Sequence, residues 1–366
     1  MDFTPTEEQT AARELAARVF GDLAAPERPA AAGTGTDPEL WKALCAAGLV
    51  GAVTELGLLG LVLLLEEQGR TTAQVPFAST CVYGLLAVAS HGSAEQRERL
   101  LPGIGDGSVV VGGALPAQGG VRASGRGELT GTVPVVPWLR EATHVLVADG
   151  RRRLWLTPVP QPGARVEPVE LTAPWSAGRL TLDGARAERL GGAPLGGEGA
   201  NGEGADGDHA PAHSDAYSDV LATARTAFAG LQAGVCAGSL ARAVAHTTSR
   251  EQFGRPLATR QAVQLRAADA YMDTEAIRVT AYEAAWRRDA GLPYGTHALT
   301  AAWWASDAGQ RVVHAGQHLH GGAGADLRHP VHRHFLWGRQ LDAYLGCGAE
   351  LLQELGELIA EGEAGA

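Results

Sequence analysis

The stretch that decides the fold is SREQFGRPLATRQAVQ, residues 249–264, which lies between two long helical patterns. Before it, apolar side chains recur at roughly helical spacing and predict one long helix over 217–250. After it, a second helix is expected over 260–290, a third over about 296–319 and a last one over about 347–361. Residues 216–366 are therefore predicted to form a helical domain.

Toward the N-terminus, residues 1–108 also show helical patterns, and Thr6 with the acidic residues after it marks the first helix start. Residues 109–190 differ, because short β-branched runs separated by Gly, Pro and Asp predict a small antiparallel sheet domain. Residues 191–215 are rich in Gly, Ala and Asp, so they cannot offset the entropy of ordering, and we expect a flexible linker there.

Composition excludes several classes of protein. The 366 residues fit two or three packed units, and the formal net charge of -11 argues against binding to DNA or an anionic membrane. The four cysteines are far apart and form no CxxC pair, so neither a zinc site nor a disulfide framework is indicated. The N-terminus lacks the pattern of a signal peptide, and the longest apolar run, at 57–65, is too short to cross a bilayer. A cytoplasmic location is expected.

Several motifs in the right order carry a resemblance to a known family. The stretch 249–264 is similar to the R-x-Q-F-G-x-P…x-Q segment of the acyl-CoA dehydrogenases, and HLHGGAGADLRHPVHRHF at 318–335 is similar to their Q-x-x-G-G-x-G…P…R segment. DPELWKALCAAGL at 37–49 and SAEQRERLLPGI at 93–104 match as well. The resemblance implies a mainly α chain with a small β domain: an N-terminal helical domain, a middle antiparallel β domain and a C-terminal four-helix bundle.

The resemblance also assigns roles to individual residues. It implies that FAD is the cofactor and that Arg225 lies near the pocket for an acyl-CoA or acyl-carrier thioester. Arg250 matches an arginine that reaches across a dimer interface to the FAD diphosphate, for which a forked guanidinium is suited. The other positions assigned to the cofactor are Gln252, Phe253, Gln261, His318, Gly321, Gly322 and Gly324. Taken singly, Arg250 is better explained by a helix-end ion pair and the glycines by a helix end, but their occurrence together and in order favours the cofactor roles.

The catalytic base of the family is missing. Family members use a glutamate to remove the α-proton while the β-hydrogen leaves as hydride to the flavin. Leu345 and Ala224 occupy the two positions where family members carry that glutamate, and neither side chain can accept a proton. Asp342 is a weak candidate for a substitute, against the alternative of a solvated surface carboxylate. Cys347 is better explained as a small apolar residue.

The β domain also departs from the family pattern. The loop T-E-x-x-x-G-S-D is replaced by ALPAQGGVRAS at 114–124, and K-x-W-I-T, which lies against the flavin ring, is replaced by VPVVP at 133–137. Pro137 has neither an N–H nor a hydroxyl to offer the ring. The contacts that this chain would make to its own FAD are thus weakened, whereas those it would lend to a partner are retained.

Three hypotheses for function follow. The first is an FAD-linked acyl-CoA dehydrogenase-like protein, in particular the glutamate-lacking subunit of a heteromer with a paralogue; a homo-oligomer stays open. The second is a non-catalytic structural subunit. The third is a non-oxidising enzyme that reuses the acyl-thioester pocket. The histidines from His314 to His334 lack the acidic partners of a zinc motif apart from Asp326, so no metal site is predicted.

Overall fold

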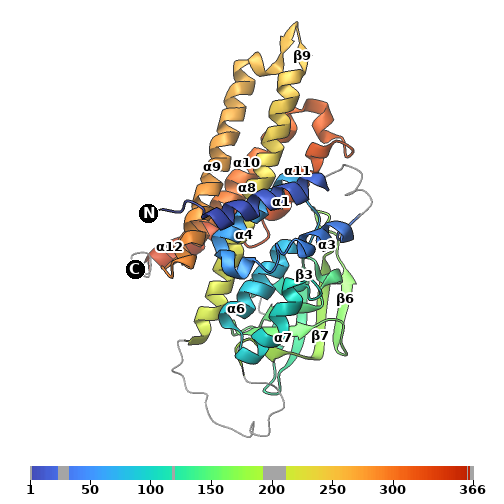
Figure 1. The fold of residues 1–366 in the computed structure, drawn as a ribbon, viewed down its shortest axis with the longest axis vertical. Coiled ribbons are helices and arrows are strands. Elements are labelled where there is room, and N and C mark those ends of the chain that lie inside the picture. Colours follow the sequence, from blue (N-terminus) through green and yellow to red (C-terminus); the bar gives the residue numbers. More distant parts are fainter. Residues whose placement is uncertain (1, 24–32, 118–119, 193–211, 361, 363–366) are drawn as a thin grey trace.

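The computed structural model describes residues 2–23, 33–117, 120–192, 212–360 and 362. Long helices form one end of the molecule, and two small sheets pack beside shorter N-terminal helices at the other (Figure 1). Of the linker predicted at 191–215, residues 193–211 lie outside the described residues. The N-terminal elements are α1 (Glu7–Asp22), α3 (Pro38–Ala46), α4 (Val53–Thr71), α5 (Phe77–Ser79), the π-helix η1 (Thr80–Leu86), α6 (Ala87–His91) and α7 (Ala94–Gly105).

Local sequence explains where these helices begin. At α1 the Thr6 hydroxyl accepts from the backbone N–H of Gln9, and the Gln9 side chain accepts from the N–H of Thr6. Ser93 and Gln96 repeat this capping box at α7. Inside α4, Gly57 has a φ of 72°, which breaks the helix before the buried apolar run that follows.

The middle domain consists of two four-stranded sheets, with strand orders β1-β4-β5-β8 and β2-β3-β7-β6. The described pairs are antiparallel except for β1 with β4, which is parallel because the chain crosses to the second sheet before it returns as β4. Leu129, Val136, Val145 and Leu180 lie in a separate apolar core of this domain. The strands are β1 (Val111–Ala114), β2 (Val121–Ala123), β3 (Glu128–Val136), β4 (His144–Ala148), β5 (Leu154–Pro158), β6 (Ala164–Pro168), β7 (Gly178–Arg186) and β8 (Glu188–Arg189), with the 3-10 turn η2 (Leu139–Glu141) after β3.

The C-terminal domain is built around α8, which contacts α4, α9, α10 and α11. Backbones approach closely where α4 crosses α8, since a Cβ added at Gly234 would lie 2.1 Å from the carbonyl oxygen of Glu66. The elements are α8 (Ala212–Ser249), β9 (Glu251–Gln252), β10 (Arg255–Pro256), η3 (Leu257–Thr259), α9 (Gln261–Asp289), α10 (Gly295–Leu319), η4 (Gly321–Ala325), α11 (Pro330–Leu341) and α12 (Gly348–Ala360).

Two helices of this domain, α11 and α8, are not explained by their sequence pattern alone. The sequence predicts no helix over 330–341, because polar residues interrupt the apolar spacing; yet α11 forms and buries Val331, His334 and Trp337 on one face. Within the described residues, α8 is long and apolar enough to cross a membrane, but 72% of its apolar window is buried inside the protein. Burial of that kind is expected of the central helix of a core.

Candidate functional site

Arg225, which the resemblance assigns to the acyl pocket, reaches from α8 to the turn that follows α11. Its Nε donates to the carbonyl oxygen of Leu345 at 3.4 Å, which joins two positions 120 residues apart. Its Nη1 and Nη2 donate to the two carboxylate oxygens of Glu354 on α12 at 2.8 and 2.6 Å. Arg225 is 7% exposed. The pocket arginine is thus held in a bidentate ion pair by this chain's own last helix.

A cavity of about 770 Å³ opens beside Arg225, between the first turns of α8, the turn at 343–346 and α12. Its lining combines ionic groups with apolar ones: Arg152, Arg225, Glu350, Glu354, Leu221, Leu299, Leu345 and Leu358. The Arg152 guanidinium lies 5.6 Å from the centroid of the Tyr217 ring. A second, narrow cavity of about 20 Å³ lies on the other side of Leu345, where Phe228 and Leu351 help to enclose it. It has room for about one water molecule.

Sequence reasoning missed the contribution of α12. Glu350 and Glu354 are one helical turn apart, so they lie on the same face of α12 at the cavity. The four-residue spacing of these two glutamates was the only sign in the sequence that they share a face. It could not identify Arg225 as their neighbour, because Arg225 and Glu354 are 129 positions apart.

Replacing Glu354 with glutamine is expected to lower the free energy of unfolding by about 1 kcal/mol, since Arg225 keeps its buried charge and loses its counter-ion. The loss is modest because Glu354 is itself partly exposed. Urea denaturation measures it, with Glu357→Gln as the matched control: Glu357 lies on the same helix and pairs with the neutral Gln353. Equal losses in the two variants would contradict the prediction.

The structure provides no catalytic carboxylate at either family position among the described residues. Leu345 is 6% exposed and Ala224 is fully buried, so both positions hold packed apolar side chains. Asp342, the weak substitute, is buried rather than solvated and forms an ion pair with Arg339 at 2.7 Å. Burial raises the pKa of Asp342, the charge of Arg339 opposes this, and its side chain lines neither cavity. Cys347 is half-buried.

Aromatic side chains pack between Trp138, which follows the segment 133–137, and Tyr344, which precedes Leu345. The centroids of Trp138 and Trp175 are 6.1 Å apart, and those of Trp175 and Tyr344 are also 6.1 Å apart. The hydroxyls of Tyr344 and Tyr83 lie 3.0 Å apart, and burial raises the pKa of both phenols. Phe228 and Trp337 complete this aromatic cluster, whose members are buried except for Tyr344, which is partly buried. These packed rings adjoin the segment that the resemblance places against the flavin ring.

The remaining predicted cofactor residues gather at the opposite end of α8. Arg250, Gln252 and Gln261 are exposed, and Phe253, at the tip of the β9–β10 hairpin, is 91% exposed. The glycine turn is nearby, because His246 on α8 stacks on His320, the residue before Gly321. His318 and Gly322 are exposed as well, whereas Gly324 is buried.

Two glycines of this turn have a physical requirement for glycine. Gly321 has a φ of 62°, and a Cβ at Gly324 would lie 2.3 Å from the carbonyl oxygen of Gln317. Gly322 has open space around its Cβ position. The backbone at this end of the molecule is thus held in a tight turn that leaves its outer surface open.

The two groups of predicted residues cannot serve one site within a single chain. Arg225 and Arg250 are 25 positions apart in sequence, and a helical rise of 1.5 Å per residue separates the two ends of that segment by about 37 Å. An arginine side chain is far shorter than this distance. Arg250 is therefore available to another molecule and not to the cavity of its own chain.

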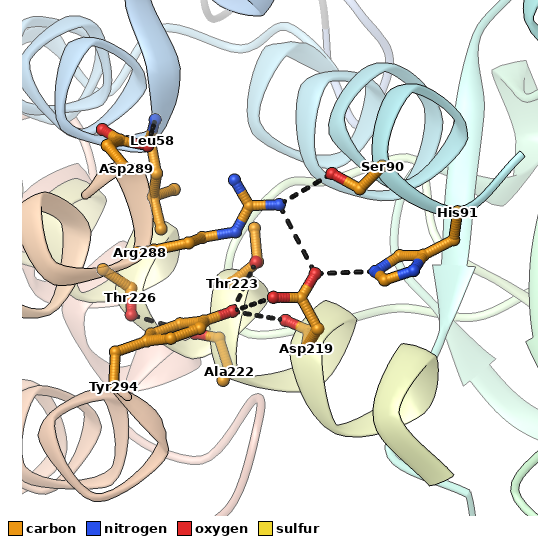
Figure 2. Close-up of polar contacts among 10 residues, drawn as sticks. All are labelled: Leu58, Ser90, His91, Asp219, Ala222, Thr223, Thr226, Arg288, Asp289 and Tyr294. Carbon is orange, nitrogen blue, oxygen red and sulfur yellow. Dashed lines mark hydrogen bonds and ion pairs between the residues drawn. The ribbon is translucent and has the colours of Figure 1, made fainter. Parts of the chain in front are cut away.

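A partly buried polar network fixes the helix that carries Arg225. Asp219, two turns earlier on α8, contacts His91 Nε2 at 2.8 Å and Arg288 at 3.4 Å, and accepts from the Tyr294 hydroxyl at 2.6 Å (Figure 2). Burial alone would raise the pKa of Asp219, but these hydrogen bonds and the charge of Arg288 lower it to about 2. Because His91 ends α6 and Arg288 lies near the end of α9, this network joins the two helical domains at the wall of the cavity.

A second contact at the same place strengthens the junction. The carboxylate of Asp289 accepts from the backbone N–H groups of Leu58 and Leu59 at 2.8 Å each. It thereby caps the part of α4 that restarts after Gly57 (Figure 2). Neither Asp219 nor Asp289 was singled out from the sequence, because each acquires its partners through tertiary packing.

Comparison with known proteins adds independent information. The model of the acyl-CoA dehydrogenase N-terminal domain matches residues 6–108, and that of the acyl-CoA dehydrogenase C-terminal domain matches residues 215–357. Acyl-CoA dehydrogenase FadE27 of Mycobacterium tuberculosis is 32% identical over 353 residues, covering 89% of each chain. FadE28 of the same organism is 28% identical and covers 97% of this chain and 98% of its own length.

Solved structures show the same relationship. A variant of the steroid ACAD Tcur3481-Tcur3483 is 41% identical, covers 98% of this chain and 99% of its own, and superposes with a TM-score of 0.88. The ChsE4-ChsE5 complex from Mycobacterium tuberculosis contains a chain that is 30% identical, with 99% coverage of both chains and a TM-score of 0.88. Butyryl-CoA dehydrogenase from Megasphaera elsdenii shares the fold at 22% identity, with 98% of this chain and 100% of that one covered and a TM-score of 0.83.

Proposed function

Because this chain belongs to the acyl-CoA dehydrogenase family, we propose that it is the glutamate-lacking subunit of a heteromeric, FAD-linked dehydrogenase. One observation carries the proposal: Leu345 and Ala224 fill both base positions with packed apolar side chains, whereas Arg250 and the glycine turn are exposed about 37 Å away along α8. In this assembly a paralogue supplies the catalytic base. This chain supplies groups that bind the cofactor from the opposite side.

The chemistry of the exposed end suits a diphosphate. Arg250 offers a planar fork of N–H donors to phosphate oxygens, and the Gly321–Gly322 backbone has open space around it. FAD held between the two chains would supply the hydride-acceptor chemistry of the family. The part taken by this chain is to hold and orient the nucleotide.

An exposed apolar face supports association with another chain. Leu265, Met272 and Val279 recur every seven residues on α9 and are each at least half exposed. Leu265 and Met272 border a surface groove of about 890 Å³ between α9 and α10. Large apolar side chains exposed at a heptad spacing on one helix are typical of a helix that packs against another chain. The naming of two solved relatives as paired chains, Tcur3481-Tcur3483 and ChsE4-ChsE5, favours a paralogue as the partner.

We further propose that the substrate of the assembly is an acyl thioester that carries a steroid. The support is the 41% identity with a protein described as a steroid ACAD. Within this chain, the ion pair between Arg225 and Glu354 and the narrow space beyond Leu345 disfavour a second, independent reaction in its own cavity.

We also propose that the protein is located in the cytoplasm.

The test is a visible absorption spectrum of the purified chain, alone and after co-expression with a glutamate-bearing paralogue. We expect a flavin band in the co-expressed assembly and none in the single chain. A stoichiometric flavin band in the single chain, or oxidation of acyl-CoA by the single chain at the rate of the assembly, would show that the chain is a complete dehydrogenase.

A further inference from the structure

Three histidines from three different elements meet beside the glycine turn. His246 lies near the end of α8, His320 joins α10 to η4, and His329 caps α11. The ring centroids of His246 and His320 are 4.7 Å apart, and those of His320 and His329 are 4.8 Å apart. The resemblance assigned none of these three to the cofactor. His320 is buried and the other two are partly exposed, so this histidine cluster borders the surface.

Hydrogen bonds determine which ring nitrogens can face a ligand. His320 Nδ1 lies 2.7 Å from the carbonyl oxygen of Gly316, so it carries a proton and donates. His329 Nδ1 accepts from the backbone N–H of Val331 at 3.3 Å, so a neutral His329 carries its proton on Nε2. In both rings Nε2 is left for a further partner, as a donor in neutral His329 and as an acceptor in neutral His320.

The electrostatic surroundings favour an anion. Burial lowers the pKa of His246 and His329, and the pKa of each is lowered further by its histidine neighbours and by an arginine, Arg250 for His246 and Arg242 for His329. Asp326 acts in the opposite direction on His329. Further titratable groups lie close in sequence to His320 and His329. They are His318 on α10, Arg328 before α11, and His332, Arg333 and His334 on α11. A bound anion would relieve the repulsion among these positive groups.

A metal ion is a poorer match for this geometry. The rings of His246 and His320 are stacked with an interplanar angle of 26°, so their in-plane lone pairs do not converge on one point. In the part of the chain that the structure describes, no group of three or more His, Cys, Asp or Glu is arranged to hold a metal.

We propose that His246, His320 and His329 form a phosphate-binding subsite, continuous with Arg250 and Gly321, that takes up protons when it binds a diphosphate. The proposal rests on the proposed function, since the diphosphate would belong to the flavin nucleotide shared with the partner chain. It adds binding residues and a pH dependence to that shared site. Affinity should rise as the pH falls, because protonation of His246 and His329 adds positive charge beside the bound anion.

The experiment is calorimetric titration of the purified chain with ADP at about pH 6 and about pH 8, in buffers of different ionisation enthalpy. Each linked proton changes affinity by up to about tenfold per pH unit, so we expect binding about tenfold tighter at the lower pH, with net proton uptake. His246→Gln and His329→Gln should remove most of the proton uptake. His297→Gln is the control, because His297 pairs with Glu283 at the far end of α10.

The outcomes separate this inference from the proposed function. Affinity independent of pH, or absence of ADP binding by a chain whose co-expressed assembly still carries flavin, would overturn the histidine subsite alone. No ADP binding together with a flavin-free assembly would overturn both. Tight Zn²⁺ binding that disappears in the same histidine variants would assign a metal site and overturn the phosphate subsite.

Discussion

The Asp219→Ala variant is expected to be less stable than the unmodified chain by about 3 kcal/mol, because it leaves the charge of Arg288 buried without its carboxylate. The same change removes the carboxylate that accepts from Tyr294 and contacts His91, two residues that tie the start of α10 and α6 to α8 (Figure 2). Urea denaturation followed by far-ultraviolet circular dichroism measures the loss. Asp183→Ala is the matched control, since Asp183 is an exposed aspartate on β7.

The pH dependence of stability provides a second readout for the same carboxylate. Its pKa is lowered to about 2 in the folded chain from the ordinary value of 3.8. A depressed pKa stabilises the folded state above the unfolded pKa, and this contribution is lost as the pH falls from about 4 toward about 2. In Asp219→Asn this part of the acid sensitivity should be missing. Indistinguishable acid-unfolding profiles would show that Asp219 is not the group responsible.

A double-mutant cycle distinguishes the ion pair from general loss of packing. Arg288→Met should rescue part of the stability lost in Asp219→Ala, because it removes the unpaired charge while keeping an apolar side chain of similar length. Strictly additive losses would mean that the pairing between Asp219 and Arg288 contributes nothing beyond the space that the side chains fill.

The second large effect is expected in the assembled protein. Arg250→Ala should lower the affinity of the co-expressed assembly for FAD by about tenfold or more, because a charge-assisted bond to a phosphate typically contributes 1.5–3 kcal/mol. Flavin retained after desalting, read from the visible spectrum, is the measurement. The fold of this chain should be unchanged, because Arg250 is exposed at the end of α8.

Two further variants make this result specific. Arg255→Ala removes an exposed arginine from the neighbouring strand β10 and should leave flavin retention unchanged. Arg250→Lys should retain an intermediate amount, since an ammonium keeps the charge but loses the fork. Full flavin retention in Arg250→Ala would contradict the assignment of this residue to a shared site.

The sequence alone was sufficient for the family and for the order of the elements. Long apolar periodicity placed α8, α9 and α10 to within a few residues, because helices of this length depend on local spacing. The expectation of a small β domain also held, although the parallel pairing of β1 with β4 depends on a crossover that no local pattern records. The helix α11 was missed because its inner face includes the buried His334 in place of an apolar residue.

What the tertiary structure alone decided is how the retained and missing residues are distributed in space. From the motifs one could name Leu345, Ala224 and Arg250, since each is defined by its neighbours in the chain. The motifs could not show that Glu354 pairs with Arg225, that Trp138, Trp175 and Tyr344 pack together, or that three histidines meet beside Gly321. These contacts join residues far apart in the chain, and a sequence specifies such partners only through the packing of the whole fold.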